Sequence, residues 1–229
     1  MMKYVIFDVD GTLVDSVDYH TESWQRAFEK FGKKIEPSLI REQIGKGGDQ
    51  LMPEFLNESE LEEFGEKLDE FRSELFKSEY LDRVQPFPQT RDLIEKLVAD
   101  GKNVALASSA SASELEHYKQ LIGVEDILKA EATTEDAENS KPEPDIFEAA
   151  LKKLGNPPAN EVVVVGDSPY DAVAARKLDV KTVGLLSGNF TKESLEFEGC
   201  VEIYQHIAEL LKNYEESIVG NKKTPNAND

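Results

Sequence analysis

The sequence predicts an α/β protein with a doubly wound parallel sheet and a small α-helical cap domain inserted after the first strand. Short apolar runs, typical of strands buried on both faces, alternate with segments of helical periodicity. The alternation stops over residues 16–85, where only helical patterns occur. We therefore expect an α/β core domain of residues 1–15 and 86–214 and a helical domain of residues 16–85. Residues 215–229 lack periodicity and are expected to form a disordered tail.

Four apolar runs predict strands of the sheet. Their sequences are YVIF, NVALA, EVVVV and KTVGLL, at residues 4–7, 103–107, 161–165 and 181–186. Continuous apolar runs of this length are expected of strands buried on both faces in a parallel sheet.

Helical patterns follow these runs. Residues 89–101 and 144–155 carry apolar side chains at helical spacing, and each segment ends in glycine, the residue that most often terminates a helix. A third helix is expected to begin at Ser168 and Pro169, because serine caps helix starts and proline is tolerated in the first turn.

The insertion contains three helical segments, at residues 16–32, 38–45 and 58–80. Pro86 and Pro88 then disfavour helix and return the chain to the core pattern. A segment inserted directly after the first strand would lie above the carboxyl ends of the strands, where α/β sheets bind their ligands.

Composition limits the partners. The 229 residues carry a net charge of −20, which argues against nucleic acid because its phosphates would be repelled. The single Cys200 excludes an internal disulfide framework. No run approaches a membrane span, and the residues before Asp8 are too few for a signal-peptide core, so we expect a soluble cytoplasmic protein. The chain could be a monomer or a homodimer.

Acidic residues follow two of the predicted strands. Asp8 and Asp10 follow the first strand, and Asp167 follows the run VVVVG. A calcium loop starting at Asp8 is excluded, because its positions six and twelve hold Leu13 and Tyr19 instead of glycine and glutamate. Solvated turn residues are one alternative. The other is a shared Mg²⁺ site, since this ion prefers carboxylates, waters and phosphate oxygens.

Two further residues could contact a phosphate. Ser108 follows the strand NVALA, where a hydroxyl and free N–H groups at a helix start bind phosphate well, although serines here could simply cap the helix. Lys141 stands beside Pro142 in a loop before a helix and could anchor phosphate or be solvated.

In this order, DVDGT, a strand-ending serine, a Lys-Pro pair and GDSPYD resemble the four motifs of the haloacid dehalogenase-like (HAD) hydrolase superfamily. The resemblance extends to about residue 212. It implies a Rossmann-like core, and the helical insertion looks like the cap of the phosphoglycolate phosphatase and β-phosphoglucomutase branch.

The resemblance also implies roles for the acids. Asp8 matches the nucleophile that accepts a phosphoryl group, and Asp10 matches the acid that protonates the leaving oxygen and later activates water. Asp8, Asp10 (through its main-chain carbonyl) and Asp167 match the Mg²⁺ ligands. Asp171 matches a supporting acid that could orient a lysine or a metal-bound water.

Ser108, Ser109 and Lys141 match the phosphate-binding positions of the superfamily. An acid at position 10 points to phosphate esters, because dehalogenases carry a non-acidic residue there. We therefore expect an Mg²⁺-dependent phosphatase acting on phosphoglycolate or a sugar phosphate through an aspartyl-phosphate. A β-phosphoglucomutase-like mutase and a catalytically silent binding protein are the alternatives.

The cap is expected to choose the substrate, a small phosphorylated metabolite. Residues 44–55 form its most loop-like stretch, and Lys46 and Gly47 are predicted to contact the substrate unless the glycines only make a turn. His20, near the cap entrance and one helical turn from Trp24, is also predicted to contact the substrate, unless the two side chains simply pack in the helix. The loop lacks the arginine of the mutase branch, which favours the phosphatase.

Overall fold

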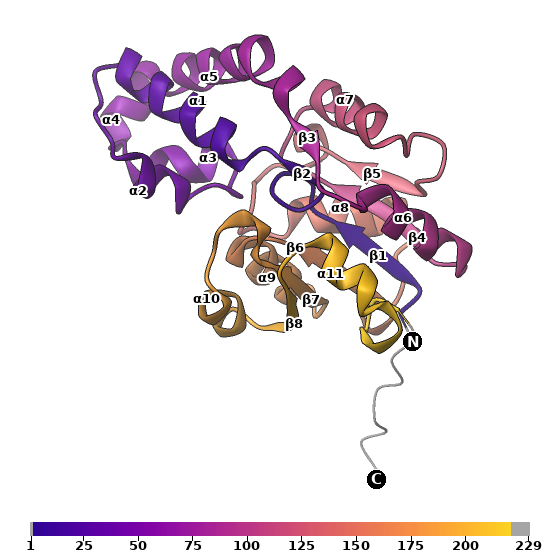
Figure 1. The fold of residues 1–229 in the computed structure, drawn as a ribbon. Coiled ribbons are helices and arrows are strands. Elements are labelled where there is room, and N and C mark those ends of the chain that lie inside the picture. The colour runs from indigo at the N-terminus through magenta and orange to yellow at the C-terminus, as the bar shows by residue number, and fades with distance from the viewer. Residues whose placement is uncertain (1, 221–229) are drawn as a thin grey trace.

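A computed structural model of the chain describes residues 2–220. It confirms the predicted doubly wound sheet, whose six strands are all parallel and run in the order β5-β4-β1-β6-β7-β8 (Figure 1). The strands are β1 (Tyr4–Phe7), β4 (Asn103–Ala107), β5 (Ala130–Ala132), β6 (Val162–Gly166), β7 (Lys181–Leu185) and β8 (Cys200–Tyr204).

The four predicted strands are present, and their ends differ from the prediction by one residue at most. The sequence did not reveal β5 and β8. Both lie at an edge of the sheet, where a strand is only partly buried, and each contains a glutamate, Glu131 or Glu202. Partial burial removes the continuous apolar run by which the inner strands were recognised.

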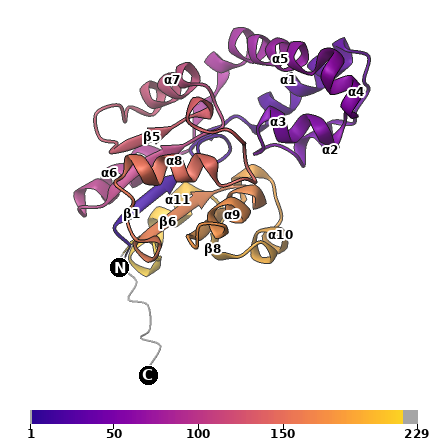
Figure 2. The ribbon, with the colours of Figure 1, turned by 180° about the vertical axis from the view of Figure 1, so that it is seen from behind.

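Alternate residues of each strand face opposite helical layers. Val5 and Phe7 of β1 pack in one cluster with the helices α6 (Thr90–Ala99), α7 (Ala112–Ile122) and α11 (Ile207–Lys212). Ile6 packs in a second cluster with α8 (Asp145–Lys153) and α9 (Pro169–Arg176), which cover the face seen in Figure 2. The short helix α10 (Lys192–Phe197) lies beside the edge strand β8.

The insertion forms its own helical body to one side of the sheet's carboxyl edge (Figure 1). Its helices are α1 (Val17–Lys30), α2 (Pro37–Arg41), α3 (Gly48–Leu51), α4 (Glu58–Glu60) and α5 (Glu66–Glu79), with a π-helical turn at Leu61–Gly65. They enclose a separate apolar cluster that includes Trp24, Phe28 and Leu68. The two crossings between core and cap pair as short antiparallel strands, β2 (Val14–Asp15) and β3 (Gln85–Pro86).

Short 3₁₀ turns complete the described secondary structure. They are Met52–Glu54, Leu81–Arg83, Thr134–Asp136, Ala159–Glu161, Leu186–Gly188 and Tyr214–Glu216. Of the helices between residues 2 and 220, none is long and apolar enough to cross a membrane.

Two local expectations differ from the structure. The loop predicted over residues 44–55 is helical from Gly48 onward, because burying Leu51 and Met52 in the cap outweighs the conformational freedom of the glycines. The tail predicted to start at residue 215 is packed through residue 220, since Ile218 and Val219 are buried in the core cluster. Residues 221–229 lie outside the described part of the chain.

A buried lysine helps to hold this C-terminal segment. Lys102 Nζ donates 2.8 Å hydrogen bonds to the main-chain carbonyls of Met2 and Gly220. These two hydrogen bonds join both ends of the described chain to the core. The hydrophobic pattern of the sequence does not predict them.

Candidate active site

Three carboxylates meet at the carboxyl edge of the sheet. Asp8 follows β1, Asp167 follows β6, and Asp171 lies in the first turn of α9. Because β1 and β6 are neighbouring parallel strands, their ends bring Asp8 and Asp167 together. All three side chains are buried, and each places an oxygen within 4.8 Å of the others.

Lys141 lies between two of these acids. Its ammonium donates to Asp8 Oδ1 and, at 2.8 Å, to Asp171 Oδ1. The side chain is only 1% exposed. Burial alone would lower the pKa of Lys141, but the two carboxylates outweigh it and raise the pKa above its ordinary value. Lys141 is therefore a fixed positive charge beside Asp8.

A threonine that the sequence analysis did not single out also contacts the acids. The Thr12 hydroxyl donates to Asp167 Oδ1 at 2.7 Å and lies 3.2 Å from Asp8 Oδ2. It stands two residues after Asp10 in the first motif, which is the only signal that could have identified it.

Burial and mutual repulsion disturb the titration of the acids. Burial raises the pKa of Asp8 to about 6, with Lys141 opposing the rise and Asp171 adding to it. The pKa of Asp167 is raised well above its usual range by burial and by the charges of Asp8 and Asp171. Three carboxylates share the single positive charge of Lys141, so a further cation bound beside them would be favourable.

The surroundings of Asp167 fit a small divalent cation. Gly11 and Gly188 lie against its carboxylate so closely that a Cβ would come within 2.4 and 1.8 Å of Oδ2. A side chain at either position would therefore collide with the Asp167 carboxylate. Mg²⁺ accepts such hard oxygen ligands, and Asp8 and Asp167 could hold it. The Asp10 side chain does not belong to this cluster, although the sequence analysis listed Asp10 among the ligands through its carbonyl.

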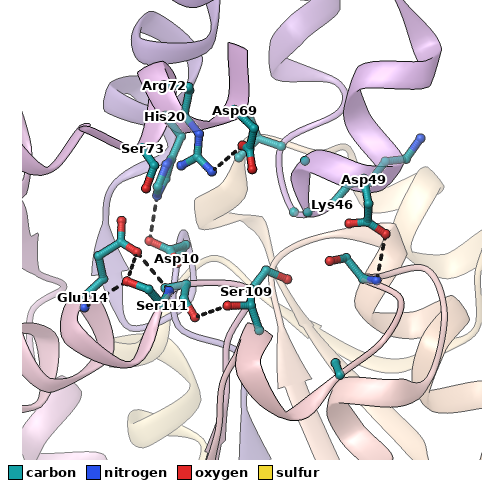
Figure 3. Close-up of a pocket in the computed structure, with 18 of the residues that line it drawn as sticks. Asp10, His20, Lys46, Asp49, Asp69, Arg72, Ser73, Ser109, Ser111 and Glu114 are labelled. Carbon is teal, nitrogen blue, oxygen red and sulfur yellow. Dashed lines mark hydrogen bonds and ion pairs between the residues drawn. The ribbon is translucent and has the colours of Figure 1, made fainter. Parts of the chain in front are cut away.

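The Asp10 side chain instead bridges core and cap. Its Oδ1 accepts from Ser16 Oγ at 2.7 Å and lies 2.9 Å from His20 Nε2 (Figure 3). The His20 ring is stacked on Phe76 of the cap at 4.0 Å between centroids. Burial would raise the pKa of Asp10, but the charge and hydrogen bond of His20 lower it to about 2.

The two predicted phosphate-binding serines occupy different places. Ser108 is fully buried, accepts from the main-chain N–H of Ala110 at 3.0 Å and lies 3.4 Å from Asp10 Oδ2. Ser109 lines the pocket. The residue that caps the N-terminus of helix α7 is Ser111, and not Ser108 or Ser109. Ser111 forms a capping box with Glu114.

A cavity of about 360 Å³ separates these core residues from the cap. Asp8 and Asp10 form part of its wall on the core side, while His20, Trp24 and Arg72 line it on the cap side. The predicted core residues outside the cavity lining are Ser108, Lys141, Asp167 and Asp171. Lys141 and Ser108 contact the lining residues Asp8 and Asp10 from behind. Asp171 is bonded to Lys141, and Asp167 to Thr12.

The predicted cap loop contacts the core directly. Gly47 lies so close to Ser140 that a Cβ at Gly47 would be 2.0 Å from the serine hydroxyl, and Asp49 Oδ2 accepts from the Ser140 N–H at 3.1 Å. The Lys46 ammonium contacts Gln43 at 2.6 Å and Glu54 at 2.7 Å, although Lys46 also lines the cavity. Its charge is therefore already paired.

Comparison with known proteins agrees with this geometry. The sequence profile of the haloacid dehalogenase-like hydrolases matches residues 5–185. The phosphorylated carbohydrates phosphatase of Thermotoga maritima is 28% identical over 80% of this chain and 84% of its own length. The phosphoglycolate phosphatase of Yersinia pestis is 29% identical over 92% of both chains. A hydrolase from Pseudomonas syringae superimposes with a TM-score of 0.86 at 27% identity, covering 94% of this chain and 99% of that one.

The fold, the strand-end acids and these relatives define a phosphatase-type hydrolase. The chain belongs to the haloacid dehalogenase-like hydrolase family, in its phosphoglycolate phosphatase and β-phosphoglucomutase branch, as the order of motifs in the sequence predicted.

Proposed function

We propose that the protein is an Mg²⁺-dependent phosphatase that hydrolyses a small phosphomonoester, of the phosphoglycolate or sugar phosphate type, through an aspartyl-phosphate. The observation that carries the proposal is the buried contact of Lys141 with Asp8, with Asp10 beside the same cavity. The phosphatases of Thermotoga maritima and Yersinia pestis, whose names state such substrates, support it.

In the first step an Asp8 carboxylate oxygen attacks phosphorus and the bond to the ester oxygen breaks. The leaving oxygen takes its proton from Asp10, so the alcohol departs neutral. Lys141 reduces the repulsion between the Asp8 carboxylate and the phosphate dianion and holds the attacking group in place. A bound Mg²⁺ would supply further neutralisation of the phosphate oxygens.

In the second step Asp10, now a carboxylate, removes a proton from water. The water oxygen attacks phosphorus, the Asp8–phosphorus bond breaks, and phosphate leaves with Asp8 restored. The low pKa of Asp10 keeps its side chain ionised, and this second step needs the carboxylate form. A phosphate dianion arriving near Asp10 raises its pKa, which favours the protonated form needed in the first step.

The proposal is tested with a panel of phosphomonoesters, with and without Mg²⁺, following phosphate release and isomer formation. We expect Mg²⁺-dependent phosphate release that Asp8→Asn reduces at least about a thousandfold, while Asp92→Asn, an exposed acid on α6, serves as the matched control. Release that survives Asp8→Asn would contradict the nucleophile, and isomerisation without net release would favour the mutase.

A further inference from the structure

Helix α5 of the cap presents an acid and a base to the cavity, three residues apart. Asp69 and Arg72 both line it on the side facing Asp10 (Figure 3). Arg72 Nη2 donates to Asp69 Oδ1 at 3.3 Å. The pair plays no part in the phosphoryl transfer proposed above, and the sequence analysis read this helix only as an acidic segment of the insertion.

Both side chains are held in place by their neighbours. The Arg72 guanidinium carbon lies over the Trp24 ring, 4.8 Å from its centroid, a cation–π contact that restricts the side chain. Gly48 lies against Asp69 and Trp24, because a Cβ there would come within 2.8 Å of Asp69 Oδ1 and 3.3 Å of the Trp24 ring. This is a preformed donor and acceptor pair rather than a flexible surface contact.

Arg72 retains unused donor capacity. An arginine carries five N–H donors, and the hydrogen bond to Asp69 uses one of those on Nη2. Nε is buried without a hydrogen-bond partner among the described residues, so the donors left for a ligand in the cavity are the remaining ones on Nη1 and Nη2. Asp69 is acceptor-only, and its side chain is 43% exposed. The pair therefore offers both donors and acceptors to a ligand in the cavity.

The charges around the cavity argue against a second anionic group on that ligand. The carboxylates lining it are Asp8, Asp10, Asp49, Asp69, Glu114 and Glu138. Among the described lining residues the lysines and arginines are Lys46, paired with Glu54, and Arg72, paired with Asp69. A carboxylate or second phosphate near the cap would therefore meet net negative charge.

A hydroxyl group meets no such penalty. It donates and accepts at once, so neighbouring hydroxyls can satisfy Arg72 and Asp69 together, whereas a carboxylate can only accept and is repelled by Asp69. A cavity of about 360 Å³ also lies within the range of sites that enclose a whole small molecule.

We propose that Arg72 and Asp69 form a hydroxyl-binding subsite, so that the substrate is the phosphate ester of a neutral polyhydroxylated alcohol and not one with a second anionic group. The inference rests on the proposed phosphatase function and narrows its substrate class. It assigns to the cap a pair of specificity residues that lie outside the glycine-rich loop.

Binding is tested with the Asp8→Asn variant, which holds esters without turning them over. Sorbitol 6-phosphate and 6-phosphogluconate form a matched pair, because they differ only in a CH₂OH group replaced by a carboxylate. We expect Kd for sorbitol 6-phosphate to be at least about tenfold lower, and pyrophosphate and phosphoglycolate to bind as weakly as 6-phosphogluconate.

Substitutions test whether Arg72 and Asp69 cause the preference for sorbitol 6-phosphate over 6-phosphogluconate. Arg72→Ala should lower kcat/KM for sorbitol 6-phosphate about ten- to a hundredfold, mainly through KM. Asp69→Asn keeps the shape but removes the charge, so the preference over 6-phosphogluconate should shrink at least about fivefold. Arg41→Ala is the matched control, since Arg41 is a cap arginine with an acidic partner, Asp18, outside the cavity lining.

The preference is the ratio of the values measured for the two esters on one preparation of protein. Partial misfolding of a variant changes both values alike and leaves their ratio unchanged. Equal binding of the two esters, or a ratio unchanged in Asp69→Asn, overturns the subsite. If the wild-type protein hydrolyses no ester, the proposed function fails, and the Kd ratio in Asp8→Asn still tests the subsite on its own.

Discussion

The two ends of the cavity are built on opposite principles. At the core end, Lys141 is 1% exposed and bonded to two acids, and Asp8 and Asp167 follow directly after the neighbouring strands β1 and β6. At the cap end, Asp69 is 43% exposed and Arg72 makes a single long hydrogen bond to it.

This difference indicates that the core end carries out the phosphoryl transfer, whereas the cap end selects the substrate. Buried, paired charges on a rigid sheet keep their geometry whichever alcohol is attached to the phosphate. The cap helices pack around their own apolar cluster, so the side chains with which they line the cavity can change without disturbing the geometry of the core end. The predictions below test this separation.

Removing the lysine should damage the core end most. Lys141→Met leaves Asp8 and Asp171 buried without their cation, so we expect a loss of about 3–5 kcal/mol in the free energy of unfolding. Phosphatase activity should fall at least about a hundredfold. Denaturant unfolding and steady-state kinetics measure both. The exposed Lys153→Met is the control, and equal stability of the two variants would contradict the role of burial.

The core end should also make stability depend on pH and metal. The folded-state pKa of Asp8, about 6, lies above that of the unfolded chain, so native protein keeps protons that unfolded protein has released. The free energy of unfolding should therefore fall, on the order of 2 kcal/mol, as pH rises from about 4 to about 6.

Denaturant titrations between pH 4 and 8 without metal measure this slope. Added Mg²⁺ should reduce it, because a bound cation favours the ionised acids. Asp8→Asn should reduce it as well. A stability that rises over this interval in metal-free protein would show that the burial of Asp8 does not control it.

The junction between the two ends should be sensitive to a single methyl group. Gly47→Ala places a Cβ 2.0 Å from Ser140 Oγ, so the cap cannot seat as it does here. We expect kcat/KM to fall about tenfold, with recovery in the double variant Gly47→Ala, Ser140→Gly. Gly65→Ala, where a Cβ would come no closer than 3.6 Å to a neighbour, is the control. No recovery would argue against this contact.

The smallest effect is expected at Lys46. Its ammonium is already neutralised by Glu54, so Lys46→Ala should change kcat/KM by less than about threefold. A loss comparable to that of Arg72→Ala would show that Lys46 exchanges Glu54 for the substrate and that the cap end has two cationic anchors.

Much of the core end could be predicted from the sequence. The apolar runs predicted β1, β4, β6 and β7, and parallel strands bring their carboxyl ends to one edge, so Asp8 and Asp167 were expected at the same edge of the sheet. The strand order of the structure makes them neighbours. The motif order identified the family correctly. These features depend on local periodicity and on the direction of a strand, which a single sequence records.

The cap end could not be predicted in the same way. Arg72 and Asp69 are ordinary helix residues, and only the packing of α5 against Trp24 and Gly48 turns them toward the cavity. Lys46 lines the cavity, but its ion pair with Glu54 could not be predicted from the sequence.

The sequence by itself determined four strands of the sheet, the strand ends that carry the acids and the class of chemistry, because these follow from short-range patterns. Tertiary structure decided how the charges are shared: Lys141 with Asp8 and Asp171, Asp10 with His20, and Arg72 with Asp69. It also decided that residues 217–219 are buried. The contacts of Lys141 join residues 133 and 30 positions apart in the sequence, so only the packing of the folded chain decides that these charges meet.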